Sequence, residues 1–364
     1  MNPQHRYWLG FHLIPQMGAV RILQLKQYFG SLEGAWRASD SDLRQASLPQ
    51  NALQAVLQQR KTIDLDKAWQ RIQDLGITFM TLDDADYPAD LRVIPDPPPV
   101  LYVQGQLTEA DSLALAIVGT RRATRYGRDV TSLLARQMAS SGVTIVSGMA
   151  LGIDTAAHQG AIQAQGRTIA ILGCGIDITY PKENHKLAQQ IIQHGALISE
   201  FPLGTPPTGS NFPRRNRILS GLSLGVLVTE APIKSGALIT AETALEQSRE
   251  VFAVPANIFN KVGQGCNQLI KEGATLVTEA ADILDALNVA YVRTTTKHQT
   301  EQAAPENDIE KQVLQLLEID PIHIDDIIRI SKFSSNDVIA ALTILELKGL
   351  AITSGPMQYS RAIR

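Results

Sequence analysis

Clusters of glycine, arginine, lysine and small polar residues follow the apolar runs in the middle of this sequence. Gly119, Thr120 and Arg121 follow one run, and Ser147 and Gly148 follow the next. Glycines let the backbone approach an anion, the start of a helix offers free N–H groups, and basic side chains add charge. These residue types therefore predict a groove that binds phosphate.

Known nucleotide-binding enzyme signatures are absent from these clusters. Gly119 stands alone, and Gly173 and Gly175 lack the third glycine of a dinucleotide-binding turn. No Gly-Lys pair is present for a P-loop. The stretch 234–240 (KSGALIT) does not match the Pro-Gly-Gly-x-Gly-Thr loop of phosphoribohydrolases. We expect a protein that is not an enzyme, and the alternative is a nucleotide- or small-ligand-binding Rossmann enzyme related to phosphoribohydrolases.

The remaining titratable residues favour structural roles. Glu200 and Glu230 both end apolar runs, where orienting an arginine or capping a helix is favoured over acid–base catalysis. His158 and His185 lack the i, i+4 partner of a helical zinc site. Cys174 is expected to be a small buried residue. We therefore expect neither a metal nor a cofactor.

A parallel β-sheet must position these clusters. Short, continuous apolar runs alternate with stretches of helical spacing, as in a Rossmann-like α/β domain with both faces of the sheet covered. Ligands of such folds bind outside the carboxyl ends of the strands. A strand is expected to start at 100–103, and the strands of the parallel sheet are expected at 113–118, 143–146, 168–172, 196–198, 224–229 and 251–254.

Two further regions flank this core. Helical spacing predicts a head over residues 1–80, similar to a sterile-alpha-motif or helix-hairpin-helix domain, with a turn at 14–18 for which plain packing is favoured over phosphate binding. The Rossmann-like domain spans 81–287, and 288–308 is polar and reads as a linker. Three helices and a hairpin over 309–364 predict a winged-helix domain.

Composition narrows the cellular setting. The chain has 364 residues and a formal net charge of −3, which excludes a polybasic binder along its whole length. No apolar run is long enough to span a membrane, and the amino-terminal residues do not resemble a secretory signal. Two cysteines are too few for a disulfide framework, so we expect a cytoplasmic protein that does not bind membranes.

Seven motifs, in this order, give the chain a close resemblance to the bacterial DNA-processing protein family DprA, also called Smf. The resemblance implies a non-catalytic mediator that binds single-stranded DNA, protects incoming strands in natural transformation and helps load the recombinase RecA. It also implies a homodimer formed through the Rossmann-like domain. The motifs are IVGTR (117–121), SGMALGIDTAAH (147–158), YPKEN (180–184), SEFP (199–202), NFPRRNRI (211–218), SGALITA (235–241) and CNQLIKEGA (266–274).

The resemblance assigns basic DNA contacts to Arg121 and Lys182, with the 211–217 motif flanking the groove. Phe212 and Tyr180 are candidates for base stacking, whereas packing is favoured for Phe201. The full set of expected DNA-binding residues is Gly119, Thr120, Arg121, Arg122, Ser147, Gly148, Lys182, Phe212, Arg214, Arg215, Asn216, Arg217, Ser235 and Gly236.

Three local features of the sequence bear on the resemblance and on DNA binding. Residues 209–211 read Gly-Ser-Asn where relatives often carry a basic residue, and Pro255 is followed by Ala256 instead of glycine. The expected recognition helix of the winged-helix domain, 334–347, carries Asp337 and Glu346 but no basic residue. A winged helix that reads duplex DNA usually has a basic recognition helix, so a protein-interaction or regulatory role is favoured here.

Overall fold

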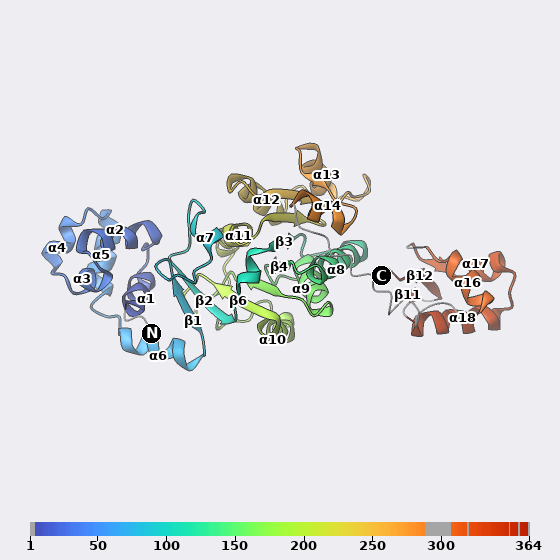
Figure 1. Cartoon of the computed structure of the whole chain (residues 1–364), viewed down its shortest axis with the longest axis horizontal. Coiled ribbons are helices and arrows are strands. Elements are labelled where there is room, and N and C mark those ends of the chain that lie inside the picture. Colours follow the sequence, from blue (N-terminus) through green and yellow to red (C-terminus); the bar gives the residue numbers. More distant parts are fainter. Residues whose placement is uncertain (1–3, 288–306, 319, 349, 356, 363–364) are drawn as a thin grey trace. The chain divides into compact units, whose positions relative to one another are not determined.

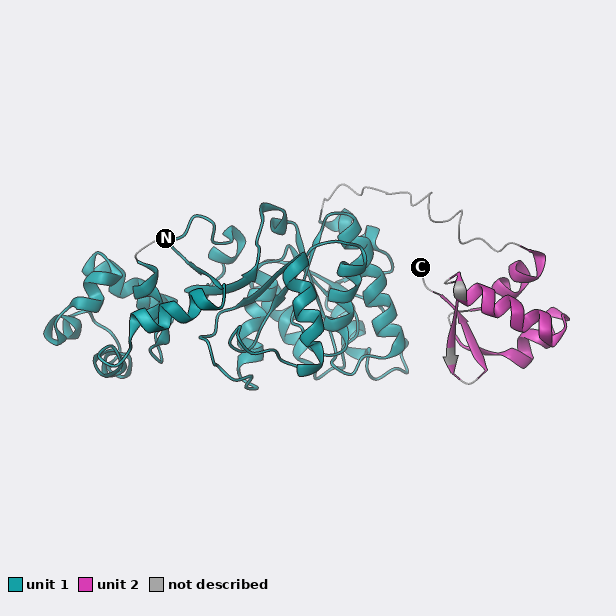
Figure 2. Cartoon of the chain, turned by 90° about the horizontal axis from the view of Figure 1, so that it is seen from below, with its two compact units in different colours: residues 1–291 teal, residues 292–364 magenta. Residues whose placement is uncertain are grey.

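The chain forms two compact units, Met1–Tyr291 and Val292–Arg364 (Figure 2). The computed structural model describes residues 4–287, 307–318, 320–348, 350–355 and 357–362. The linker expected at 288–308 lies outside the described residues, apart from its last two positions.

The first unit begins with a head of short helices packed around a shared apolar core. Trp8, Leu25 and Leu43 are buried in that core. Several of these helices start at a side chain that accepts a backbone N–H, such as Ser31 from Gly34, which stabilises a helix start. The helices of the head are α1 (His5–Leu13), α2 (Ala19–Phe29), α3 (Leu32–Arg37), α4 (Asp40–Gln45), α5 (Gln50–Gln59) and α6 (Leu65–Asp74).

A nine-stranded sheet forms the centre of this unit in the described part of the chain (Figure 1). Its order is β1-β2-β6-β5-β4-β3-β7-β8-β9, with antiparallel pairing at β1–β2 and β2–β6 and parallel pairing elsewhere. The strands are β1 (Thr78–Thr81), β2 (Val100–Gly105), β3 (Ala114–Val118), β4 (Thr144–Ser147), β5 (Thr168–Ile171), β6 (Gly195–Ser199), β7 (Gly225–Val228), β8 (Glu250–Ala253) and β9 (Thr275–Leu276).

Helices cover both faces of the sheet. Alternate residues of β3 point to opposite faces: Leu115 and Ile117 pack with α8, α9 and α14, whereas Ala116 and Val118 belong to the apolar cluster that contains α11 and α12. This unit's further helices are α7 (Ala89–Arg92), η1 (Glu109–Ser112), α8 (Arg125–Ser140), α9 (Ile153–Gln163), η2 (Lys182–Asn184), α10 (His185–His194), α11 (Asn211–Gly221), α12 (Gly236–Glu246), α13 (Gln264–Lys271) and α14 (Ala280–Ala286).

The strand order creates a switch point between β3 and β7. From β3 the chain builds β4, β5 and β6 on one side, then crosses back to build β7 and β8 on the other. The connections therefore leave the carboxyl ends of β3 and β7 in opposite directions and open a crevice there.

This fold confirms the expected Rossmann-like core with a helical region before it. All seven expected strands form, within one or two residues of the expected ends. The short strands β1 and β9 were not expected. β1 pairs with β2 and spans the boundary expected at residue 80, so the division between head and core stays a prediction.

The second unit is a winged-helix domain, as expected. Val313, Ile327 and Leu342 are buried where its three helices meet. Its small sheet has the order β10-β12-β11. The elements are α16 (Asp308–Leu316), β10 (Ile322–His323), α17 (Ile324–Ser331), α18 (Ser335–Leu347), β11 (Ala351–Gly355) and β12 (Gln358–Arg361). Among the described residues of the whole chain, no helix is long and apolar enough to cross a membrane.

Candidate nucleic-acid interface

A cleft of about 620 Å³ opens at the switch point. It is bounded by the turn after β3, the start of α9, one side of α11 and the start of α12. Five of the expected DNA-binding residues line its wall near the strand ends and the start of α12, and three lie on α11. The expected residues in the lining are Gly119, Thr120, Arg121, Phe212, Arg215, Asn216, Ser235 and Gly236.

Arg121 and two aromatic rings lie together in the lining of this cleft. The Arg121 guanidinium carbon lies 4.8 Å from the centre of the Phe212 ring. The Tyr180 ring is 5.8 Å from the Phe212 ring and inclined by 36°. Arg121 is exposed and forms no ion pair with a carboxylate of the described residues. A free cation beside two accessible rings can hold a phosphate and stack bases.

Two glycines allow the cleft wall to pack closely. A Cβ on Gly119 would lie 2.5 Å from Ile153 Cγ1, and a Cβ on Gly148 would lie 2.4 Å from the Arg215 guanidinium. The hydroxyl of Ser147 is buried and donates to the Ile117 carbonyl at 2.6 Å. Ser147 and Gly148 therefore shape the wall, and neither presents a free polar side chain to the cleft.

The floor of the cleft carries two buried charges of opposite sign. Arg215 donates through Nη1 to the carbonyls of Gly148, at 3.0 Å, and Ile171, while its buried Nε has no partner. Burial lowers the pKa of Arg215 to about 10. Asp154 accepts from the Ala150 N–H at 3.2 Å, and burial raises the pKa of its carboxyl. Sequence reasoning did not include Asp154, although its position at the first turn of a helix after a strand was a usable signal.

The rim near α12 combines a helix start with a cation. Ser235 accepts the Ala237 N–H at 3.2 Å, and Asn216 donates to the Gly236 carbonyl at 3.4 Å. Lys234 is exposed and lines the cleft, although it was not among the expected binding residues. Its place directly before Ser235 was the signal that could have included it.

Lys182 and Arg122 are exposed near the cleft but do not line it. Lys182 begins η2, two residues after Tyr180, and Arg122 follows Arg121. Both remain accessible to a strand that extends beyond the cleft.

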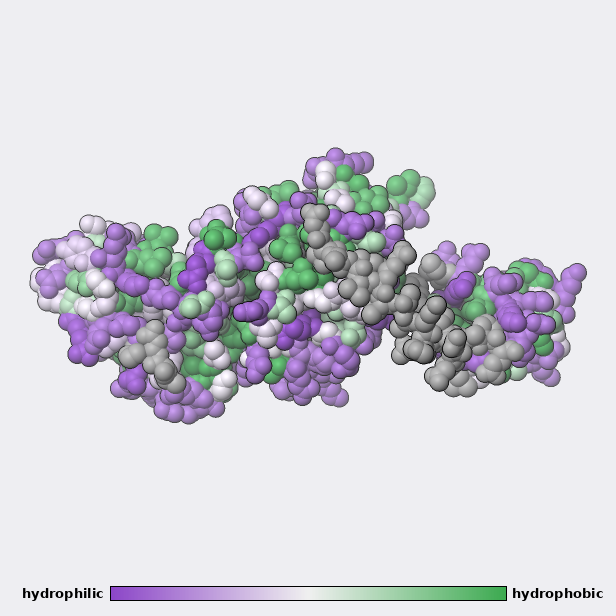
Figure 3. Space-filling view, viewed as in Figure 1, coloured by the Kyte–Doolittle hydropathy of each residue, from purple (hydrophilic) through white to green (hydrophobic). Residues whose placement is uncertain are grey.

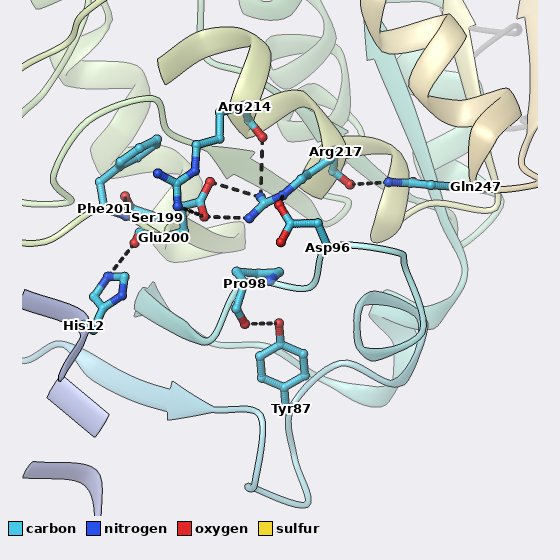
Figure 4. A network of polar contacts seen from close by, with 10 residues as sticks. All are labelled: His12, Tyr87, Asp96, Pro98, Ser199, Glu200, Phe201, Arg214, Arg217 and Gln247. Atoms are coloured by element: carbon cyan, nitrogen blue, oxygen red, sulfur yellow. Dashed lines mark hydrogen bonds and ion pairs between the residues drawn. The ribbon is translucent and has the colours of Figure 1, made fainter. Parts of the chain in front are cut away.

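Arg214 and Arg217 face away from the cleft and converge on Glu200 (Figure 4). Arg217 binds both carboxylate oxygens of Glu200, at 3.0 and 2.7 Å, and its Nε donates to Asp96 at 3.0 Å. Arg214 binds the same carboxylate at 3.1 Å and also lines a second cavity of about 500 Å³ against residues 14–18. Although burial disfavours its charge, Glu200 and Asp96 raise the pKa of Arg217 above its usual value.

The structural roles expected for Glu230, His158 and Cys174 are confirmed. Glu230 accepts from the backbone and hydroxyl of Thr124, both at 2.7 Å, at the start of α8. His158 is buried and bonds Thr168 at 2.7 Å, and its burial lowers its pKa to about 3. Burial raises the pKa of the Cys174 thiol to about 11. No group of metal-binding side chains occurs among the residues described.

The recognition helix of the winged-helix domain has the expected acidic character. In α18, Asp337 is exposed near the start. Lys348 follows the helix and pairs with the buried Glu310 at 2.9 Å. The basic residue closest to this helix is thus engaged within the domain.

Two known protein families match this chain, one over the Rossmann-like core and one over the winged-helix domain. The family described as DNA recombination-mediator protein A matches residues 78–288, which contain the whole cleft. This chain belongs to that family. The DprA winged helix domain matches residues 297–354.

Relatives of the family match over much of the chain. Protein Smf of Synechocystis sp. is 35% identical, covering 99% of both chains. Protein Smf of Escherichia coli is 41% identical over 74% of both chains, and DNA processing protein DprA of Bacillus subtilis is 44% identical over 60% of this chain and 75% of its own.

Solved structures of the family agree with the fold. DNA processing protein A of Streptococcus pneumoniae is 33% identical with a TM-score of 0.67, covering 78% of this chain and 98% of its own. The Helicobacter pylori protein, whose structure is described for its single-stranded DNA binding mode, is 33% identical with a TM-score of 0.53. That match covers 59% of this chain and 98% of the other.

Proposed function

We propose that this protein binds single-stranded DNA in the switch-point cleft and acts as a recombination mediator without catalysing a reaction. The observation that carries the proposal is the assembly of the exposed Arg121 and Tyr180 with the half-buried Phe212, with 4.8 Å between the cation and the Phe212 ring. Single strands are bound by cations that follow the backbone and by rings that stack on any base. The single-strand binding described for the Helicobacter pylori protein supports the same assignment.

Within this proposal the residues divide by task. Phosphates contact Arg121, Lys234 and the N–H groups at the start of α12, where the helix dipole favours an anion. Bases stack on Phe212 and Tyr180. Lys182 and Arg122 contact the strand outside the cleft. Arg214 and Arg217 support α11 from behind, because both are engaged by Glu200.

The wider role includes partners. We propose that the bound strand is protected during natural transformation and passed to RecA in the cytoplasm, and that the protein acts as a homodimer formed through the Rossmann-like domain. Among the described strands, β9 is an edge of the sheet with an exposed leucine, Leu276. An unpaired edge with an apolar side chain is suited to pairing with a second copy.

Titration of the full chain with labelled oligo-dT at several salt concentrations tests the binding. We expect log affinity to fall linearly with log salt, with a slope of about −0.7 for each neutralised phosphate. Mixed-sequence strands should bind about as tightly, because stacking and charge contacts tolerate any base. A salt-independent affinity, or no binding at low salt, refutes the proposal.

A nucleotide-binding enzyme is the rival function. The buried carboxyl of Asp154 in the cleft favours it, because groups with shifted pKa values concentrate at catalytic sites. The two functions differ in one assay: incubation of the purified protein with nucleoside mono- and triphosphates. Product formation that Asp154→Asn abolishes establishes the enzyme, and unchanged nucleotides support the binding protein.

A further inference from the structure

The loop after β8 presents two large apolar side chains to solvent. Ile258 is 73% exposed and Phe259 is 87% exposed. The backbone around them is held in place: Asn267 bonds both the N–H and the carbonyl of Ala256 at 2.9 Å, and Asn257 accepts the Phe259 N–H at 2.9 Å. The loop therefore presents the Phe259 ring from a fixed backbone instead of burying it.

A second exposed ring lies at the base of this loop. Tyr126, in the first turn of α8, is 44% exposed, and its hydroxyl donates to the Pro255 carbonyl at 3.4 Å. Tyr126 follows Arg121 by five residues in the turn that leaves the cleft. The chain thus connects the cation of the cleft to a ring that touches the start of the β8 loop.

Exposed basic residues lie close to the two rings in the sequence, and the carboxylate near Tyr126, Glu230, is engaged by Thr124. Arg122, Arg128 and Lys261 are exposed. The acidic group of this segment, Asp129, pairs with Arg125 at 3.4 Å. Figure 3 shows apolar atoms among hydrophilic ones around α12 and α13 on the face in view. Cations interleaved with accessible rings are typical of surfaces that bind single-stranded nucleic acid.

We infer that Tyr126 and Phe259 form a second stacking platform, on which a single strand continues from the cleft along the carboxyl ends of β3, β7 and β8. The inference rests on the proposed function, because the strand must first occupy the cleft. It adds nucleotides to the binding site: the cleft holds one part of the strand, and the two rings stack bases further along, with Arg122 and Lys261 beside the phosphates.

The test compares two strand lengths. Full-length protein is titrated with a short oligo-dT of about four nucleotides and a long one of about sixteen, the limits of common single-strand sites. Phe259→Ala should weaken the long-strand affinity by about fivefold or more and leave the short-strand affinity unchanged, as expected for the loss of one stacked base. Ile258→Ala is the matched control, because it removes a neighbouring exposed side chain that cannot stack, and it should change neither affinity.

Tryptophan fluorescence provides a direct readout. In Phe259→Trp the new indole should be quenched by the long strand and not by the short one, while the three natural tryptophans, Trp8, Trp36 and Trp69, lie in the helical head. Sedimentation of each variant measures the oligomeric state.

The outcomes separate the two proposals. Failure of the wild-type chain to bind either strand overturns the proposed function. Normal binding of both strands by Phe259→Ala, with no quenching in Phe259→Trp, overturns the platform and leaves the cleft intact. Dissociation of an oligomer by Phe259→Ala, with unchanged affinity, assigns the ring to a protein contact and also overturns the platform.

Discussion

Two arginines of the family motifs, Arg121 in the cleft and Arg217 on the side of α11 that faces Glu200, should respond oppositely to truncation. Arg121→Ala should reduce binding of oligo-dT and leave folding nearly unchanged. Arg217→Ala should destabilise the first unit and, at temperatures where it is folded, bind with nearly normal affinity. The contrast follows from the partners of each guanidinium: the Phe212 ring for Arg121, and two carboxylates for Arg217.

The magnitudes follow from those partners. An exposed cation–π contact contributes about 0.5–1 kcal/mol, so Arg121→Ala should lower the melting temperature by about 1–4 °C. A charge-assisted phosphate contact contributes about 1.5–3 kcal/mol, or roughly 10- to 150-fold in affinity. Arg217 is 12% exposed and Glu200 is fully buried. Breaking a buried pair costs about 3–5 kcal/mol, and since Arg214 still contacts Glu200 we expect about 3 kcal/mol and a loss of about 6 °C or more.

The assay measures thermal unfolding and oligo-dT affinity for each variant in the same buffer. Arg44→Ala is the control, because Arg44 is an exposed arginine of the head and should change neither quantity. Adding Lys182→Ala to Arg121→Ala should weaken binding further. The reasoning is refuted if Arg121→Ala melts early but binds normally, or if Arg217→Ala keeps its melting temperature and loses binding.

Two further expectations concern the tail and a buried histidine. Deleting residues from about 309 onward should change single-strand affinity by less than about 0.5 kcal/mol, because the cleft lies wholly in the first unit. Titration of the truncated chain with oligo-dT measures this change. Loss of most binding would place part of the site in the winged helix. Burial lowers the pKa of His158 from 6.5 to about 3, so between these values the unfolded chain binds a proton that the folded chain excludes, and stability should fall as pH decreases, by at most about 1.4 kcal/mol per pH unit. Melting temperatures measured from pH 7 downward should therefore fall less steeply for His158→Gln, and identical slopes would contradict the assignment.

The sequence was most informative about the sheet. Strands buried on both faces need continuous apolar runs, and such runs are visible without any knowledge of the fold. The two strands that were missed lie toward the edges of the sheet: β1 contains only two apolar residues and β9 has two residues in all, and they gain their pairing from β2 and β8. Their formation depends on neighbours far along the chain, which local patterns do not record.

The sequence also predicted where the candidate site lies. Parallel strands bring their carboxyl ends to one edge, so residues that follow β3 and β7 had to meet there. The sequence was also sufficient to predict structural roles for Glu200 and Glu230, because a carboxylate at the end of a buried strand must find a hydrogen-bonding partner. Which partners they find was not visible.

Only the tertiary structure decided how the 211–217 motif is divided. A helix turns by about 100° per residue, so α11 places Phe212, Arg215 and Asn216 on one side and Arg214 and Arg217 on the other. The motif shows that its arginines must separate once it is helical, but not which set faces the cleft. The position of α11 between the switch point and Glu200 settles that orientation. The buried carboxylate of Glu200 requires positive charges beside it, so Arg214 and Arg217 face Glu200 and the other set faces the cleft.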